Sequence, residues 1–415
     1  MKDVFTRIRH GFHQLRAGWQ ERPYLLSFLF LAAIILIWLG EWLGKTLWDW
    51  LTLLVIPAAL AGMAWKLAHT QQQTNQSQQQ ETALQTFFDR ISRLMLEQHL
   101  VQSPPASDAR RLARAHTVAT LRQLDGERRG RLILFLAEAD LIGETAVGQT
   151  PIIPLNHADL SYAELGTAVL NHTNLQGANL TAAQLEHAQL IHADLRRANL
   201  TEARLGQSDL RQALLWAAQL PRADLSGVTA TQAQLRVTNL HMAQLRRGDL
   251  RMADLIGADL TAADLTDADL IQANLRGAKL VGAVLVGADL RQAILRTAVL
   301  SQANLQNVIL FQANMVKADL READLTNARL WGVDLQQGVL VKAQMDGADL
   351  RGAKLRGANL TQATLRRAHL YRADLRGANL SGADLRQADL REARLETAVL
   401  TKAKISDSQL AQAKH

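Results

Sequence analysis

The chain contains no cysteine among its 415 residues. This absence excludes disulfide bonds, thiol chemistry and zinc sites built on cysteine. A strong excess of one charge is also missing, because 46 Lys and Arg stand against 39 Asp and Glu and give a formal net charge of +7. Such a mildly basic balance favours anionic surfaces in general, but it does not indicate nucleic acid as the partner.

Motifs of catalysis and of cofactor binding are missing as well. No Ser/His/Asp arrangement, glycine-rich phosphate loop or nucleotide fingerprint stands out from the periodic background. His172 and His192 are spaced so that they could face each other, and we interpret them as a polar ladder, with a metal site as the alternative. Metal sites normally need three or four converging ligands. We therefore predict that the chain is not an enzyme and has no catalytic residue, cofactor or metal.

Two long apolar runs occupy residues 24–67, and the segment EWLGKTLWD between them is too short for a domain. Each run approaches the roughly 20 residues that cross a bilayer. The pattern predicts a transmembrane helical hairpin, and the basic residues before it place both termini in the cytoplasm by the positive-inside rule. The predicted spans are about 24–42 and 47–67, after a basic cytoplasmic segment at residues 1–23.

Residues 68–150 connect this hairpin to the rest of the chain. The stretch HTQQQTNQSQQQE has no apolar residue to bury and predicts a spacer or a solvated helix extension. Leu84, Phe87 and Ile91 then recur at helical spacing and predict an amphipathic helix. The apolar positions after SPPASD predict further helices, which would cover the open end of the next segment. We assign the spacer and amphipathic helix to residues 68–103 and a helical cap or linker to residues 104–150.

A repeat of five residues fills the remainder of the chain. From Leu155 to Leu410 nearly every fifth residue is leucine, and the residue two places before it is usually alanine. Neither regular element buries such a pattern, because five residues advance an α-helix by about 500° and an odd step along a strand changes its face. If each unit is a short extended piece followed by a corner, both residues point inward. The chain then winds into a solenoid whose coils stack about 4.8 Å apart.

The number of corners in each coil follows from the residue after each leucine. If four units make one coil, hydroxyl residues such as Thr181 and Thr201 gather on one face and arginines gather on another. Glycine is frequent at the last position of a unit, as at Gly177 and Gly257, where a corner needs a positive φ. We therefore predict a mainly β solenoid over residues 151–415, a four-sided β-helix of about thirteen coils and on the order of 60 Å long.

The units ADLRG, ANLSG and ADLRQ match A(D/N)LXX, and roughly the last 260 residues resemble the pentapeptide-repeat family. The resemblance implies a right-handed quadrilateral β-helix. The segment FFDRISRLMLEQHL and the helical residues after it look like the part that joins membrane anchors to repeats in some bacterial members. Together with the hairpin, this similarity implies a multi-pass protein of the bacterial inner (cytoplasmic) membrane or of an internal membrane.

A column of outward side chains on one face is the first candidate binding surface. In this aromatic column Phe311 stacks on Trp331, and Arg351 lies between two aromatic rings. Exposed aromatic and arginine side chains are typical of interface hot spots. The alternative is a stabilising ladder with cation–π contacts and no partner. The column consists of Ile271, Arg291, Phe311, Trp331, Arg351 and Tyr371, and Trp216 on the adjacent face is a smaller candidate contact.

The second candidate surface is the most basic of the four faces. It could lie against anionic lipid or an acidic partner. Alternatively, the charges of its DLR units pair with one another. The basic face is defined by Arg196, Arg236, Arg276, Arg296, Arg356 and Arg376.

These features predict a membrane-tethered, non-catalytic scaffold with two spans, whose rod presents a cytoplasmic surface to an unknown protein partner or to an anionic membrane. A homo-oligomer is also possible. The alternative comes from the resemblance, since the best-known family members mimic DNA and inhibit or protect DNA gyrase. Those members imply a strongly acidic rod without an anchor. The basic charge and the predicted anchor disfavour DNA mimicry and direct nucleic-acid binding here.

Overall fold

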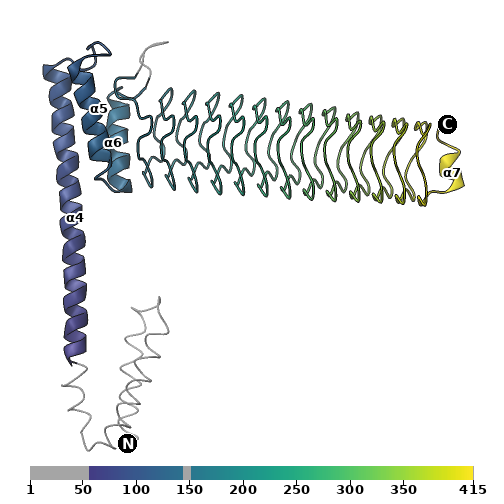
Figure 1. The fold of residues 1–415 in the computed structure, drawn as a ribbon, viewed down its shortest axis with the longest axis horizontal. Coiled ribbons are helices and arrows are strands. Elements are labelled where there is room, and N and C mark those ends of the chain that lie inside the picture. The colour runs from purple at the N-terminus through teal and green to yellow at the C-terminus, as the bar shows by residue number, and fades with distance from the viewer. Residues whose placement is uncertain (1–55, 144–150, 415) are drawn as a thin grey trace, which may run out of the picture. The chain divides into compact units, whose positions relative to one another are not determined.

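The computed structural model describes residues 56–143 and 151–414. The chain divides into two compact units, Met1–Gln79 and Gln80–His415. Among these described residues, three helices precede the repeat region and a short helix follows it (Figure 1). They are α4 (Ile56–Glu97), α5 (Asp108–Leu121), α6 (Gly126–Glu138) and α7 (Asp407–Leu410).

The prediction of a membrane anchor is wrong for the part of the chain that the structure describes. Within residues 56–143 and 151–414 no helix is long and apolar enough to cross a bilayer. The finding corrects the transmembrane hairpin, the integral-membrane partner and the inner-membrane localisation. The span 24–42 and the first part of 47–67 lie outside the described residues.

Helix α4 also continues without a break through the glutamine-rich stretch. Its last part belongs to the second unit, where it packs with α5 and α6. Phe88 contacts Phe135 of α6 with ring centroids 4.7 Å apart, and Glu81 accepts hydrogen bonds from Arg128 and Arg131. Helix α6 begins where it does because the side chain of Asp125 accepts the Arg128 backbone N–H.

Helix α6 lies directly against the first coil of the solenoid. The carbonyl of Gly126 accepts a hydrogen bond from the backbone N–H of Glu164 at 3.2 Å, which satisfies part of the exposed edge of that coil. A Cβ at Gly130 would overlap the carbonyl of Glu164, so glycine is required for this close approach. Arg129 strengthens the contact through hydrogen bonds of 2.7 and 2.9 Å to Ser161.

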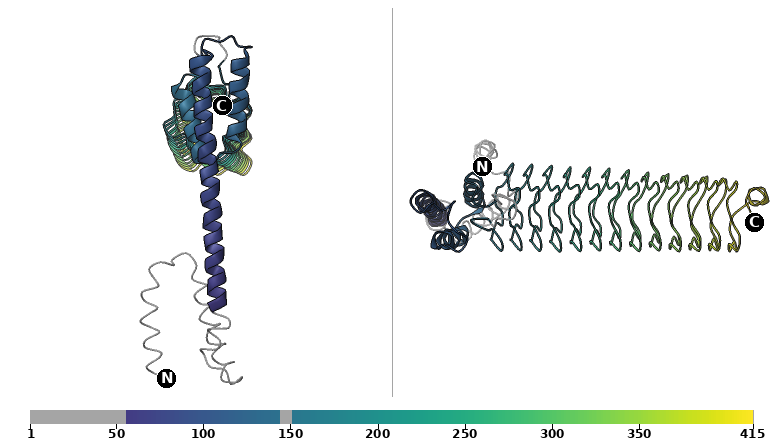
Figure 2. Two further views of the ribbon diagram at one scale, coloured as in Figure 1. Left: turned by 90° about the vertical axis from the view of Figure 1, so that its left-hand side faces the viewer. Right: turned by 90° about the horizontal axis from the view of Figure 1, so that it is seen from above.

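The repeat region is a parallel β-solenoid with twenty residues in each coil. Bridges join residues twenty apart along its whole length, from Asp159↔Asn179 to Arg394↔Lys414, and every one is parallel. The view from above shows the coils following one another in a single stack (Figure 2). From Leu155 to Leu385 the backbone N–H of each core leucine donates to the next coil, as from Leu270 to the carbonyl of Asp289 at 2.7 Å. The predicted coil of four units is therefore confirmed.

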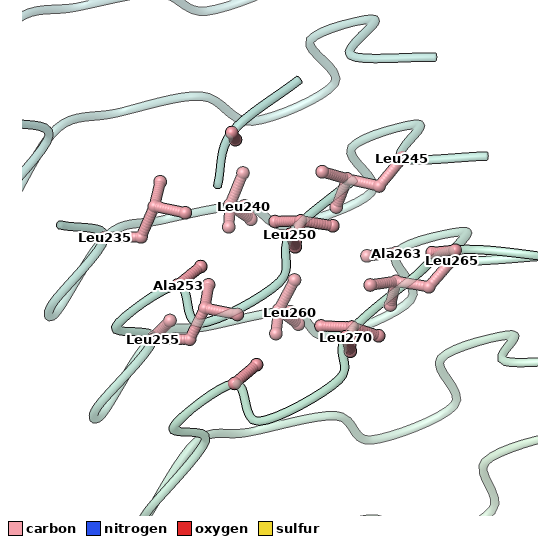
Figure 3. Close-up of a cluster of buried hydrophobic side chains, with 14 of the residues drawn as sticks. Leu235, Leu240, Leu245, Leu250, Ala253, Leu255, Leu260, Ala263, Leu265 and Leu270 are labelled. Atoms are coloured by element: carbon pink, nitrogen blue, oxygen red, sulfur yellow. The ribbon is translucent and has the colours of Figure 1, made fainter. Parts of the chain in front are cut away.

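The leucines and alanines form one continuous core inside the coils (Figure 3). Met315 and Met345 occupy leucine positions and are fully buried. The unit near residue 228 is irregular, because Val228 takes the place of the usual alanine. The next coil has Gly248 at the equivalent position, where a Cβ would lie 3.3 Å from Val228 Cγ1. A small residue thus makes room for a large one.

The corners have a positive φ whether or not they are glycine. Gly177 and Gly257 both have φ of +64°, as predicted, but Gln272 and Arg247 have φ of 58° and 55° at the same position of their units. Each corner is part of a turn, closed for example by the N–H of Ala273 donating to the carbonyl of Leu270 at 2.9 Å. Positive φ at the third residue is what a type II turn requires. The stacking of coils enforces it at a cost of about 1–3 kcal/mol for each non-glycine residue.

Candidate partner-binding site

Where an aspartate or asparagine precedes a leucine, its side chain satisfies a backbone group that the coils leave free. In units with this polar residue, the N–H of the residue after the leucine commonly donates to the side chain two residues earlier. Thr361 N–H donates to Asn359 Oδ1 at 3.1 Å, and Arg351 N–H donates to Asp349 Oδ1 at 3.2 Å. Such local bonds are typical of Asx turns. This accounts for the polar residue of A(D/N)LXX.

The same carboxylate then binds the guanidinium of an Asp-Leu-Arg unit. Arg351 donates to Asp349 at 2.7 and 2.6 Å, and Arg391 donates to Asp389 at 2.9 and 2.8 Å. The hydrogen bonds from Arg351 and Arg391 lower the pKa of Asp349 and Asp389 and outweigh the opposite effect of burial. Arginines that follow an aspartate by two residues are therefore neutralised within their own unit.

These shifts predict that the rod loses stability in acid. A carboxyl group whose pKa is lowered in the folded state stabilises the fold above its unfolded pKa of about 4, and this stabilisation disappears as the pH falls further. We expect a thermal midpoint that is level from pH 7 to about 5 and falls steadily below about 4. Thermal melts followed by circular dichroism measure this midpoint at each pH. In the double variant Asp349→Asn/Asp389→Asn the midpoint should fall less steeply as the pH is lowered. A midpoint that stays constant down to pH 2.5 would contradict the ion pairs.

The aromatic column contains one close aromatic pair. The rings of Phe311 and Trp331 have centroids 4.2 Å apart at an angle of 39°. Trp331 is 47% exposed, and Phe311 is half-buried beneath it. The corners beside the indole are Gly332 and Gly352, and a Cβ at Gly352 would lie only 4.0 Å from Trp331 Nε1. Because the neighbouring corners carry Gln312 and longer side chains, the glycines leave the edge of the indole uncovered.

The two ends of the column differ from the predicted ladder. The sequence predicts Arg351 between two aromatic rings, but its guanidinium binds Asp349 instead. The cations over Tyr371 are Arg372 and Arg391, whose Cζ atoms lie 4.9 and 5.9 Å from the ring centroid. The Tyr371 hydroxyl donates to Glu392 at 3.0 Å. Arg291, one coil before Phe311, is bound to Asp289.

A shallow groove of about 900 Å³ adjoins the aromatic pair on the same face. Arg351 and Tyr371 of the aromatic column line it. The other lining residues are not among the predicted site residues; they are charged groups in near balance, His369 and one glycine. The repeated Asp-Leu-Arg unit in the sequence predicts where these charged residues lie. It does not predict the groove between them. They are Arg329, Gly347, Asp349, His369, Asp389, Arg391 and Glu392.

The structure does not bring Trp216 to the aromatic column. Trp216 lies on the adjacent face about five coils earlier, roughly 24 Å along the rod, and Arg197 covers its ring at 5.2 Å. On the basic face, Arg196, Arg236 and Arg376 are paired with aspartates. The other three predicted residues have no ion-pair partner among the described residues: Arg276, Arg296 and Arg356.

His172 and His192 stack one coil apart, with ring centroids 4.9 Å apart and planes within 22°. Within residues 56–143 and 151–414 there is no group of three or more histidine, aspartate or glutamate side chains arranged to hold a metal ion. The pair thus has the geometry of a ladder of two imidazoles.

A rod of stacked coils with four short sides, built from five-residue units around a leucine core, defines a quadrilateral β-solenoid repeat protein. The chain belongs to the pentapeptide repeat family. The family model matches eight times between residues 155 and 414, and the matches together cover more than half of the chain. The matched segments are 155–183, 178–216, 238–277, 253–292, 273–312, 303–340, 343–382 and 378–414.

Solved structures of other pentapeptide repeat proteins are similar to parts of this chain. HetL of the cyanobacterium Nostoc sp. strain PCC 7120, involved in heterocyst differentiation regulation, is 36% identical, with 54% of this chain and 91% of HetL covered and a TM-score of 0.26. The protein alr5209 of Nostoc PCC 7120 is 34% identical, with coverages of 24% and 83% and a TM-score of 0.22. QnrB1, a plasmid-mediated fluoroquinolone resistance protein, is 16% identical, with coverages of 46% and 91% and a TM-score of 0.21. A search of curated proteins finds no match.

Proposed function

We propose that this pentapeptide repeat protein is a non-catalytic scaffold that binds a protein partner through the aromatic face of its rod. The observation that carries the proposal is the outward pair of Phe311 and Trp331 beside two glycine corners. The fold does not need large aromatic residues there, because threonine, isoleucine and arginine occupy the same column at Thr231, Ile271 and Arg291. Uncovered aromatic side chains of this kind commonly supply most of the energy of an interface.

The charges around the pair support a protein rather than a nucleic acid as the partner. Arg291 and Arg351, on the coils before and after the pair, are both held by aspartates of their own units. The groove beyond the pair has nearly equal numbers of acidic and basic groups. Nucleic-acid binding needs a net positive surface, and DNA mimicry needs free carboxylates. A partner with an apolar anchor and a mixed polar rim fits this face.

Affinity capture with the full chain tests the proposal. We expect Phe311→Ala/Trp331→Ala to reduce recovery of a reproducible partner at least tenfold, because each hot-spot residue contributes about 2 kcal/mol or more. Trp216→Ala is the matched control, since it removes an exposed tryptophan from another face. Circular dichroism checks that the rod still folds. Equal recovery of the same partner by the double variant and the control would refute the proposal.

A further inference from the structure

A second groove lies on the face next to the aromatic column. It has a volume of about 470 Å³ and is bordered by Arg366, Arg367 and Arg386, with Asp346 as its one acidic lining residue. We call it the arginine groove. Thr326, Asn327, Gly347 and Gln387 complete its lining.

Two of these guanidinium groups are fixed by one buried carboxylate. Asp384 is only 4% exposed, and its Oδ2 accepts Arg366 Nε at 2.7 Å and Arg386 Nη2 at 2.7 Å. Hydrogen bonds from Arg386 and Arg366 hold the pKa of Asp384 far below its usual range, although burial acts to raise it. Arg367 is held only by a neutral amide, through Nε to Gln387 Oε1 at 2.9 Å. Each guanidinium keeps further N–H groups, because arginine has five.

The same arrangement occurs a second time, six coils earlier on the same face. In this companion groove Arg246 and Arg247 correspond to Arg366 and Arg367. Asp264 corresponds to Asp384, is 9% exposed, and accepts Arg246 Nε at 2.6 Å. Asp264 and Asp384 are the buried carboxylates of the described residues.

The two grooves differ in charge. Where the arginine groove has Arg386 and Gln387, the companion groove has Thr266 and Asp267, and the Thr266 hydroxyl donates to Asp264 at 2.6 Å. The companion groove is therefore balanced between two arginines and two aspartates. The arginine groove has three arginines against Asp346 and Asp384, an excess of one positive charge.

We propose that the arginine groove binds a phosphate group, as free phosphate or as a phosphomonoester. Three guanidinium groups border one opening, and two of them meet at a single carboxylate oxygen, so they are positioned before a ligand arrives. A carboxylate is satisfied by one arginine fork, whereas the several oxygens of a phosphate can accept bonds from three arginines. The site is independent of the aromatic pair and of the function proposed for it.

Isothermal titration calorimetry with the full chain, at pH 7 and constant ionic strength, tests the site with inorganic phosphate, O-phosphoserine and acetate. We expect both phosphate compounds to bind at least tenfold more tightly than acetate. Tighter binding of O-phosphoserine would identify an esterified side chain as the source, and equal binding would identify free phosphate. Acetate binding as tight as phosphate would overturn the proposal.

Variants separate the groove from general surface charge. The double variant Arg386→Thr/Gln387→Asp introduces the residues that the companion groove has at the equivalent positions, so the solenoid tolerates them. It should weaken phosphate binding at least tenfold. Arg367→Gln should also weaken it about tenfold without touching Asp384. Asp346→Asn should tighten it several-fold, because it removes a negative charge while its side-chain oxygen can still accept the Arg366 N–H. Arg247→Gln in the companion groove should change nothing. Equal losses in Arg247→Gln and Arg367→Gln would overturn the proposal.

Discussion

Replacing Gly130 by alanine should separate helix α6 from the solenoid and destabilise the first coil by about 3 kcal/mol. The added Cβ would overlap the Glu164 carbonyl, which is backbone and cannot rotate away. The helix must therefore move outward. That movement weakens the Gly126–Glu164 hydrogen bond and the bonds from Arg129 to Ser161.

Amide hydrogen exchange of residues 155–175 measures this effect. A loss of about 3 kcal/mol makes exchange through local opening on the order of a hundred times faster. Gly62→Ala is the control, because Gly62 lies in α4 and, apart from its own stretch of helix, no atom lies within 4 Å of the added Cβ. Alanine is favoured over glycine in a helix by about 1 kcal/mol, so this variant should slow exchange in α4. Slower or unchanged exchange of the first coil in Gly130→Ala would show that α6 does not depend on the close contact.

Replacing Leu260 by alanine should cost about 3–5 kcal/mol in the middle of the rod. Leu260 is fully buried, with Leu240 of the preceding coil in the same column (Figure 3), and the coil backbone is too constrained by hydrogen bonds to close the cavity. Each coil contacts only its neighbours, so the loss should centre on residues 240–280.

Leu260→Met is the matched variant, because the chain itself has Met315 and Met345 at leucine positions. A volume-conserving change of this kind usually costs less than about 1.5 kcal/mol. Hydrogen exchange should show local opening around residue 260 in the alanine variant and near-normal protection in the methionine variant. Equal loss of protection over the whole rod would indicate one cooperative unit instead of a linear array.

The interior of the rod was predictable from the sequence because the repeat is regular. Leucine every fifth residue and alanine two places before it, with a twenty-residue period in the outward columns, determine which side chains are buried. The helical spacing of Leu84, Phe87 and Ile91 likewise predicted buried positions on α4. The membrane prediction was wrong for the described residues, where the polar glutamine-rich stretch makes up a large part of α4 and no helix is long and apolar enough to cross a bilayer.

The surface chemistry was less predictable, because it depends on hydrogen bonds that a period does not specify. The twenty-residue period predicted that Phe311 lies over Trp331, but it did not predict the partner of Arg351. An aspartate two residues before an arginine binds it locally, and this competes successfully with stacking on Tyr371. The grooves depend on where glycine corners such as Gly347 interrupt rows of longer side chains.

The claim that the aromatic pair is a docking site is tested most directly by placing a photoreactive benzophenone side chain at position 331 in the full chain. Position 256 provides the control, because Ile256 occupies an equivalent outward column on another face. The account predicts that one protein partner is cross-linked reproducibly from position 331 and not from position 256. It also predicts that Phe311→Ala lowers the yield at position 331. Equal cross-linking from both positions, or none from position 331, would contradict the claim.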